Sequence, residues 1–226
     1  MTAEHDLSVT PRTRLGRHRE RGKSERTDLH SVLDAGIICH LGVSIDGTPV
    51  VLPTAYGRRR DTLFVHGSSA NSSLLAADGA QVCVTVTHLD GIVCARSVFN
   101  HSMNYRSAVI FGSASLIIRE QDRLDALRVI TEHMLPGRWD AARPPSGKEL
   151  AATAVLAVPL DEASVKVRTG PPVDDPEDLA LDTWAGVLPA ALTFGSPQPD
   201  PAMNHQTPVP AHIRSVSDTI RGGARG

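Results

Sequence analysis

The alternation of apolar and polar residues along the chain predicts a mainly β protein. Residues 81–87 place valines at every second position, so that Val82, Val84 and Val86 share one face of a strand. Other strand-like runs cover residues 37–44, 49–57, 61–66, 92–99, 105–118, 153–159 and 163–168. Helical spacing is limited to short segments at residues 27–35 and 69–77 and a longer one at residues 120–134, which Pro136 and Gly137 end.

Turn signals join these strands into hairpins. Asp46-Gly47 and Asp90-Gly91 each separate two β-rich runs and predict two tight hairpins. Gly112 interrupts the long run and predicts a bulge or a bend at a barrel corner. Mainly antiparallel strands with tight turns and peripheral helices favour a closed or partly closed β-barrel over a parallel α/β sheet.

Composition divides the chain into three parts: a basic N-terminal arm at residues 1–26, a folded domain at residues 27–190, and a proline- and glycine-rich tail at residues 191–226. The tail has few large apolar residues, so we expect it to be mobile. The arm carries seven cations between Arg12 and Arg26 against Glu20 and Glu25. Two interpretations stay open for it: a solvated terminus, or a strap that pairs with acidic groups of its own fold.

Charge and cysteine usage exclude several classes of partner. A net charge of −2 offers no global attraction for nucleic acid or an anionic membrane. No apolar run has the length of a membrane span, and no signal-peptide pattern is present. The three cysteines form no C-x-x-C pair, and the histidines show no metal-ligand spacing. We therefore expect a cytoplasmic protein without a metal site.

The segment from His66 to Asn71 is the first candidate for ligand binding. A strand here enters Gly67-Ser68-Ser69 and then a helical segment, a layout in which backbone N–H groups and serine hydroxyls hold a phosphate. An ordinary helix N-cap explains the same serines. Neither a Walker nor a Rossmann glycine pattern occurs, so side chains must supply positive charge. Arg106, at the start of a long strand, either neutralises that phosphate or forms an ion pair.

Several linked motifs resemble those of one known family. They are residues 66–70, 82–91, 96–97, 101–107, 111–112, 166–172 and 184–189, in this order along the chain. Together they are similar to the pyridoxamine 5′-phosphate oxidase-related, FMN-binding split-barrel proteins, especially the branch similar to nitroimidazole-resistance flavoproteins. The resemblance covers residues 27–190.

The resemblance implies a homodimer of six-stranded antiparallel Greek-key split barrels, with one FMN at each end of the interface. It places the FMN phosphate against Ser68, Ser69 and Arg106. Along the ribityl chain or the flavin ring it places His66, Thr54, Thr85, Tyr105 and Ser107. Lys166 and Trp184 would come from the second subunit, although interface packing alone also explains a tryptophan.

The implied activity is an FMN-dependent oxidoreductase that acts on a small molecule of nitro or quinone type, with a nicotinamide or deazaflavin donor. His66 and Tyr105 are the candidate proton donors. A non-catalytic flavin- or haem-binding protein is the alternative, with His66 or His101 as the axial ligand in the haem case. A pyridoxamine 5′-phosphate oxidase-like activity is the third reading, but the Arg- and Lys-rich phosphate strand and the C-terminal Trp and Arg signature of those enzymes are missing here.

Overall fold

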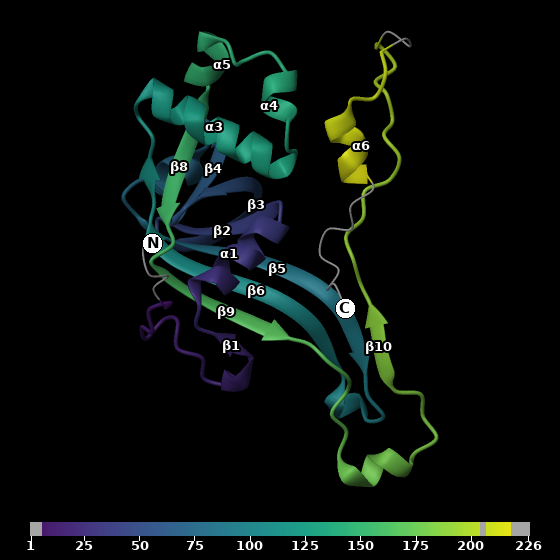
Figure 1. Ribbon diagram of the computed structural model, residues 1–226. Helices are drawn as coiled ribbons and strands as arrows, with labels where there is room; N and C mark the ends of the chain where they lie inside the picture. The colour runs from purple at the N-terminus through teal and green to yellow at the C-terminus, as the bar shows by residue number, and fades with distance from the viewer. Residues whose placement is uncertain (1–5, 204–206, 218–226) are drawn as a thin grey trace.

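The computed structural model describes residues 6–203 and 207–217, which form a curled antiparallel sheet with helices around it (Figure 1). The strands follow the order β1-β9-β6-β5-β2-β3-β4-β8-β7, with β10 paired to β5. Their bounds are β1 Gly22–Lys23, β2 Ile38–Ile45, β3 Thr48–Arg59, β4 Thr62–Ser68, β5 Gln81–Cys94, β6 Ser102–Ser113, β7 Ser115–Leu116, β8 Thr153–Pro159, β9 Glu162–Arg168 and β10 Gly186–Pro189. The mainly β split-barrel prediction is confirmed.

The strand count differs from the six that the resemblance implies. The described residues form ten strands, because short segments pair at the margins of the long ones. The split in the barrel lies within β3, whose first part pairs with β2 up to Ala55 and whose last part pairs with β4 from Tyr56. The sheet closes where β6 meets the end of β8. A Cβ at Gly112 would lie 3.2 Å from the Pro159 carbonyl oxygen, so the predicted corner glycine permits this close approach.

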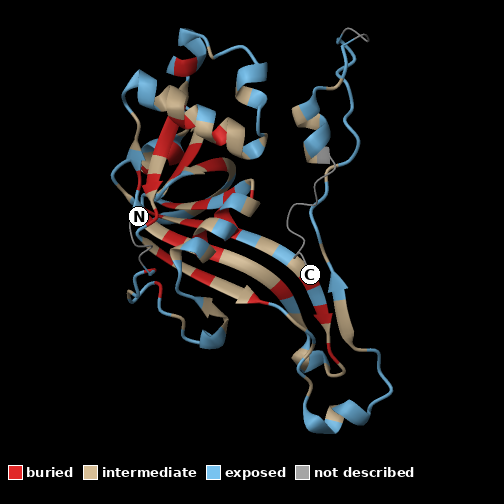
Figure 2. Ribbon diagram, viewed as in Figure 1, coloured by how far each residue is buried: buried red, intermediate tan, exposed pale blue. Residues whose placement is uncertain are grey.

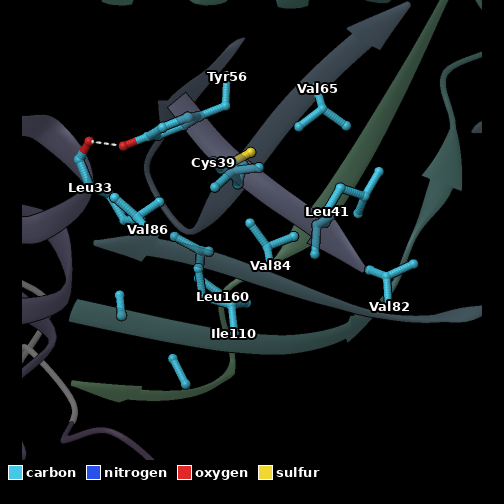
Figure 3. Close-up of a cluster of buried hydrophobic side chains, with 14 of the residues drawn as sticks. Leu33, Cys39, Leu41, Tyr56, Val65, Val82, Val84, Val86, Ile110 and Leu160 are labelled. Atoms are coloured by element: carbon cyan, nitrogen blue, oxygen red, sulfur yellow. Dashed lines mark hydrogen bonds between the residues drawn. The ribbon is translucent and has the colours of Figure 1, made fainter. Parts of the chain in front are cut away.

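The helices cover the ends and one outer side of the barrel. They are α1 Arg26–Ala35, α2 Ser72–Ala76, α3 Glu120–Met134, α4 Arg138–Ala141, α5 Gly147–Ala151 and α6 Ala211–Ser217, with single 3₁₀ turns η1 Arg19–Arg21, η2 Val98–Asn100 and η3 Pro176–Ala180. α1 closes one end of the barrel by burying Leu29, Val32 and Leu33 in the main core. Figure 3 shows the Tyr56 hydroxyl donating a hydrogen bond to the Leu33 carbonyl from inside that core.

α3 lies against the outer side of β3, β4 and β8. Phe64, Val155, Ala126 and Ile130 form a second apolar cluster between the helix and these strands. The helix backbone comes so near to β3 that a Cβ at Gly57 would lie 2.7 Å from the Cα of Ile130. Only glycine permits this separation.

The first of the two predicted hairpins is confirmed and the second is wrong. Asp46 and Gly47 both have positive φ, at 50° and 77°, as a two-residue turn between β2 and β3 requires. Asp90-Gly91 does not turn the chain: β5 continues to Cys94, and the ladder with β6 has a bulge between Leu89 and Gly91. The reversal comes later, at η2.

The N-terminal arm, from residue 6 on, forms a strap across the edge of the sheet. β1 pairs with β9, Leu7 is buried, and the Arg12 guanidinium binds the Glu162 carboxylate. Arg12 and Arg26 thus agree with the strap interpretation, because they form ion pairs with Glu162 and Asp61 of the folded domain. The tail contains α6, which lies beside the main body in Figure 1. The expectation of a mobile tail concerns in part residues 204–206 and 218–226, which lie outside the described residues.

The close approach of α3 to β3 generates the first prediction. Gly57→Ala forces a methyl group into the backbone of α3, and overpacking of this kind costs about 2–3 kcal/mol of unfolding free energy. Gly147→Ala is the control. Gly147 is the first residue of α5, and nothing lies within 4 Å of its Cβ position. Urea denaturation should show the loss for Gly57→Ala alone; equal stability of the two variants would contradict the packing account.

Candidate functional site

One open face of the sheet brings together four of the expected site residues. Side chains alternate along β6, and Tyr105 and Ser107 point away from the core residues Ala108 and Ile110. On β9, Lys166 stands opposite Ser107, and on β5, Thr87 stands opposite Ser107 from the other side. Thr85 lies on the same face of β5 as Thr87. We call this hydroxyl-rich strip, made of Thr85, Thr87, Tyr105, Ser107 and Lys166, the β5–β6–β9 face.

Arg168 adds a buried cation at the edge of the β5–β6–β9 face. It stands opposite Tyr105 and is only 8% exposed. Its guanidinium donates to the Asn104 amide oxygen and to the carbonyls of Gly170 and Pro171, all neutral acceptors, and no carboxylate among the described residues pairs with it. Burial and then the nearby charge of Arg21 lower the pKa of Arg168. The local field therefore favours an anion.

Sequence reasoning missed Arg168 as a site residue. The signal was present, because Lys166 and Arg168 are two residues apart on a strand and so share one face. What the sequence does not reveal is the burial of Arg168, which depends on the loop at residues 170–171.

Ser68 and Ser69 lie at the far side of the sheet, where the local backbone differs from the prediction. The helix begins at Ser72 rather than at Ser69, and its N-cap is Asn71, whose Oδ1 accepts from the N–H groups of Ser73 and Leu74. Ser69 N–H donates to the Ala152 carbonyl, and Ala70 N–H to the Ser68 hydroxyl. Since these N–H groups already have acceptors, an anion here would depend on side-chain hydroxyls.

Arg106 forms an ion pair within its own chain. Its Nε and Nη2 donate to the two oxygens of Asp90, each at 2.9 Å, and the Asp90 side chain is 8% exposed. This pair lies at the bulge of β5 between Leu89 and Gly91 and links it to β6. Arg106 points to the opposite face from Tyr105 and Ser107, and three strands separate β6 from β4. Arg106 and Ser68 of a single chain therefore do not lie together in one phosphate site.

The remaining expected residues lie apart from the β5–β6–β9 face. Thr54 stands opposite the buried Cys39 and is half-buried. His66 lies on the α3 side of β4, and its Nδ1 is buried without a hydrogen-bond partner. Trp184 is 71% exposed ahead of β10, and His101 bonds through Nδ1 to the Ser97 carbonyl.

An apolar pocket of about 510 Å³ lies on the outer side of the barrel, beyond the end of α3. Its floor comes from β2 and β3, one wall from the end of α3, and the other wall from the C-terminal segment. The lining side chains include Ile38, Ala55, Met134, Leu135, Phe194, Ile213 and Val216. No polar side chain takes part in this lining, so the pocket suits a large apolar ring system.

The part of the chain that is described holds neither a candidate metal cluster nor a membrane-spanning helix. No group of three or more His, Cys, Asp or Glu side chains is arranged to hold a metal ion. Among the helices of residues 6–203 and 207–217, none is long and apolar enough to cross a membrane.

Comparison with known proteins identifies the family. The sequence profile described as pyridoxamine 5′-phosphate oxidase matches residues 25–167, which is more than half of the chain. The chain belongs to the pyridoxamine 5′-phosphate oxidase-like split-barrel family. No curated protein sequence matches it.

Two solved structures of this family are similar over nearly the whole chain. The flavocytochrome Anf3 from Azotobacter vinelandii is 38% identical, with a TM-score of 0.88 over 93% of this chain and 98% of its own. The FAD and haem binding protein from Mycobacterium smegmatis is 37% identical, with a TM-score of 0.83 over 87% of this chain and 97% of its own.

A nitroimidazole-resistance relative shares the fold alone. The protein described as a 5-nitroimidazole antibiotic resistance protein from Bacteroides thetaiotaomicron is 23% identical, with a TM-score of 0.54 over 65% of this chain and 86% of its own. The nitroimidazole-resistance branch of the resemblance is thus matched in architecture, whereas the two flavocytochrome-type structures are matched in sequence as well.

The ion pair with Asp90 predicts that Arg106 stabilises the fold. Arg106→Ala leaves a largely buried carboxylate without its guanidinium and should cost about 2–3 kcal/mol of unfolding free energy, less than a fully buried pair because Arg106 is 21% exposed. Asp90→Asn should destabilise the fold as well. If Arg106→Ala instead left the stability intact and lowered flavin affinity, while Asp90→Asn changed neither, the phosphate interpretation would hold.

Burial of His66 generates a pH prediction. Burial lowers the pKa of His66, because the charged imidazolium is disfavoured there. The unfolded chain takes up this proton near the ordinary pKa of about 6.5, so it binds more protons than the native state below that pH. Native stability should therefore fall as the pH drops from 7.5 to 5.5, and less steeply in His66→Phe. His40→Gln, at an exposed position, is the control; identical slopes in His66→Phe and wild type would refute this.

Proposed function

We propose that this protein is a flavocytochrome-type electron-transfer protein that binds FAD and haem. The supporting observation is the likeness, at 38% and 37% identity over 93% and 87% of the chain, to one protein described as a flavocytochrome and to another described as an FAD and haem binding protein. The proposal favours the flavin- or haem-binding alternative over a dedicated nitro- or quinone-reductase. FAD also replaces FMN as the proposed flavin, while a role for FMN stays a prediction of the sequence.

The β5–β6–β9 face has the chemistry that a flavin requires. Thr85, Tyr105 and Ser107 offer hydroxyl donors and acceptors to a polyol chain and a ring edge. Lys166 and Arg168 supply positive charge for a phosphate or pyrophosphate, and Arg168 has only neutral partners. Lys166 Nζ already donates to the Arg17 carbonyl at 3.4 Å, so the N-terminal strap positions this ammonium group. In this proposal Ser68, Ser69 and Thr54 contact the flavin of a second copy or the far end of the same one.

The two cofactors would supply one- and two-electron chemistry, and the protein supplies their placement. Tyr105 is the proposed proton donor at the ring edge, because its hydroxyl is on the open face and has the Arg168 guanidinium beside it. His66 is less suited to that role than Tyr105, since its ring lies on the α3 side of β4. The apolar pocket excludes water from a ring system placed in it.

A homodimer is part of the proposal. Apolar side chains stay uncovered on the outer face of the same sheet: Ile38, Val51, Leu89, Ile92 and Met103 are 44–63% exposed. Exposed apolar residues gathered on one sheet face are typical of an interaction surface. A second copy against this face would enclose the flavin and keep solvent from it.

Small-molecule reduction at the flavin is the second candidate function. It is favoured by the open position of Tyr105 and Ser107, which leaves a ring edge on this face within reach of a substrate. A nicotinamide or deazaflavin donor would then reduce the flavin, and a nitro or quinone compound would take the electrons.

Cofactor analysis of the purified full-length protein tests the proposal. We expect a flavin spectrum together with a Soret band, FAD rather than FMN on chromatography of the extract, and a dimer by gel filtration. Lys166→Ala should lower flavin affinity ten- to a hundred-fold, since a charge-assisted hydrogen bond contributes about 1.5–3 kcal/mol.

Lys148→Ala, on the surface of α5, is the matched control and should leave flavin affinity unchanged. Absence of both cofactors, even after reconstitution with FAD and haemin, would overturn the proposed function. Rapid turnover with a nicotinamide donor and a quinone would favour the second candidate.

A further inference from the structure

A pocket of about 450 Å³ lies between the N-terminal strap and the edge of β9. The strap runs along this edge in Figure 1 and pairs with it through β1, where Lys23 stands opposite Val165. Leu7 anchors the start of the strap in the main core, and its N–H donates to the Ser24 carbonyl at 2.6 Å. The strap therefore returns on itself beside β9, and the pocket lies within this loop.

Three cations line the strap pocket: Arg14, Arg19 and Lys23. Within residues 6–203 and 207–217, the side chains of Arg14 and Lys23 form no hydrogen bond or ion pair, and Arg19 donates through Nε to the neutral Leu15 carbonyl at 3.2 Å. No acidic side chain of the described residues lines the pocket. Three positive charges around one cavity, without a carboxylate among them, favour an anion there.

Two nearby carboxylates are already paired with other cations. Glu162, at the start of β9, binds the Arg12 guanidinium. Glu20, the neighbour of Arg19 in sequence, lies 3.1 Å from Nδ1 of His18 and 3.7 Å from Nε of Arg21. Neither carboxylate therefore neutralises the three cations of the strap pocket.

Apolar side chains also line the strap pocket. Ala163 and Val165 come from β9, and Val9 and Leu15 come from the strap. Val9 is 74% exposed, so its side chain is free to cover an apolar group of a ligand. Ser164 adds a hydroxyl that has no hydrogen-bond partner among the described residues. A ligand with an anionic head and an apolar body matches both parts of this lining.

We propose that the strap pocket binds a phosphate monoester that carries a small apolar group. A phosphate monoester has a charge of about −1.5 to −2 at pH 7 and three acceptor oxygens, so it matches three cations better than a carboxylate does. The planar guanidinium groups of Arg14 and Arg19 suit paired contacts to phosphate oxygens, and the Lys23 ammonium adds a point charge. The volume lies within the range of about 300–1,000 Å³ that is usual for small-molecule sites.

The strap pocket is separate from the proposed flavin site. Lys166, Arg168 and Tyr105 of the β5–β6–β9 face are not among its lining residues. Its ligand is thus expected to bind whether or not a flavin is present, and the proposal does not depend on the proposed function.

Titration of the full-length protein with 1-naphthyl phosphate, followed by the fluorescence of the naphthyl group, tests the site. Arg14→Ala and Lys23→Ala should each weaken binding about three- to ten-fold, because contacts of exposed cations contribute less than buried ones. Arg17→Ala is the matched control, since Arg17 is an exposed arginine of the same strap outside the pocket lining. It should change the affinity by less than about two-fold, as expected for a screened, distant charge.

The apolar part of the site has its own test. Wild type should bind 1-naphthyl phosphate at least about ten-fold more tightly than inorganic phosphate, because only the ester buries apolar surface. Val9→Ser should reduce this difference and leave the affinity for inorganic phosphate unchanged. Saturation with FAD should leave the affinity for 1-naphthyl phosphate unchanged as well.

Four results would overturn the proposal. Wild type that shows no saturable binding of 1-naphthyl phosphate would refute the site, and equal affinity for inorganic phosphate would refute its apolar part. An equal loss in Arg17→Ala and Arg14→Ala would show a diffuse attraction to the basic strap instead of a pocket. Competition by FAD would assign the three cations to the flavin, whereas absence of flavin binding would refute only the proposed function.

Discussion

The contact between α3 and β3 at Gly57 determines which parts of the outer sheet surface are covered. Because glycine lets the helix backbone approach the strand, α3 lies flat over β3, β4 and β8 and seals their apolar side chains. The helix ends at Met134, above the start of β2, where it forms a wall of the apolar pocket. The surface beyond that point, including the β5–β6–β9 face, stays open. If α3 lay further from β3, it would neither cover these side chains nor form this wall of the pocket.

The polar and charged side chains that could bind a ligand are of two kinds. Some are paired with other side chains or cap a helix, and others are bonded only to neutral oxygens. Arg106 forms an ion pair with Asp90 and Arg96 with Asp174, and the buried carboxylates make both pairs costly to break. Asn71 accepts hydrogen bonds from backbone N–H groups at the start of α2. Lys166 and Arg168 are cations bonded to neutral oxygens instead. An incoming anion therefore gains most at the edge near β9, where no carboxylate of residues 6–203 and 207–217 bonds to the Arg168 guanidinium.

Local patterns predicted those elements whose causes are local. α3 follows the apolar spacing at residues 120–134, and β8 follows the run at residues 153–159, both as expected. The two Asp-Gly dipeptides show that the local sequence alone does not determine whether the chain turns. At Asp46 it forms the hairpin, but at Asp90 the carboxylate is held by Arg106 and a Cβ at Gly91 would lie 3.0 Å from Leu188 of β10, so distant partners keep the strand extended. The pocket was hidden for the same reason, since its walls come from residues 37–55, 134–135 and 194–216.

The strand order has a further consequence for how copies of this chain can associate. Both ends of the order are two-residue strands, β1 and β7, and the N-terminal strap adds contacts from Ser8 and Thr10 along the β9 edge. Short edges offer few free N–H and C=O groups to a neighbouring sheet. Edge-to-edge pairing of copies through these two ends is thereby discouraged, which favours association through the faces of the sheet, where a two-fold arrangement closes on itself.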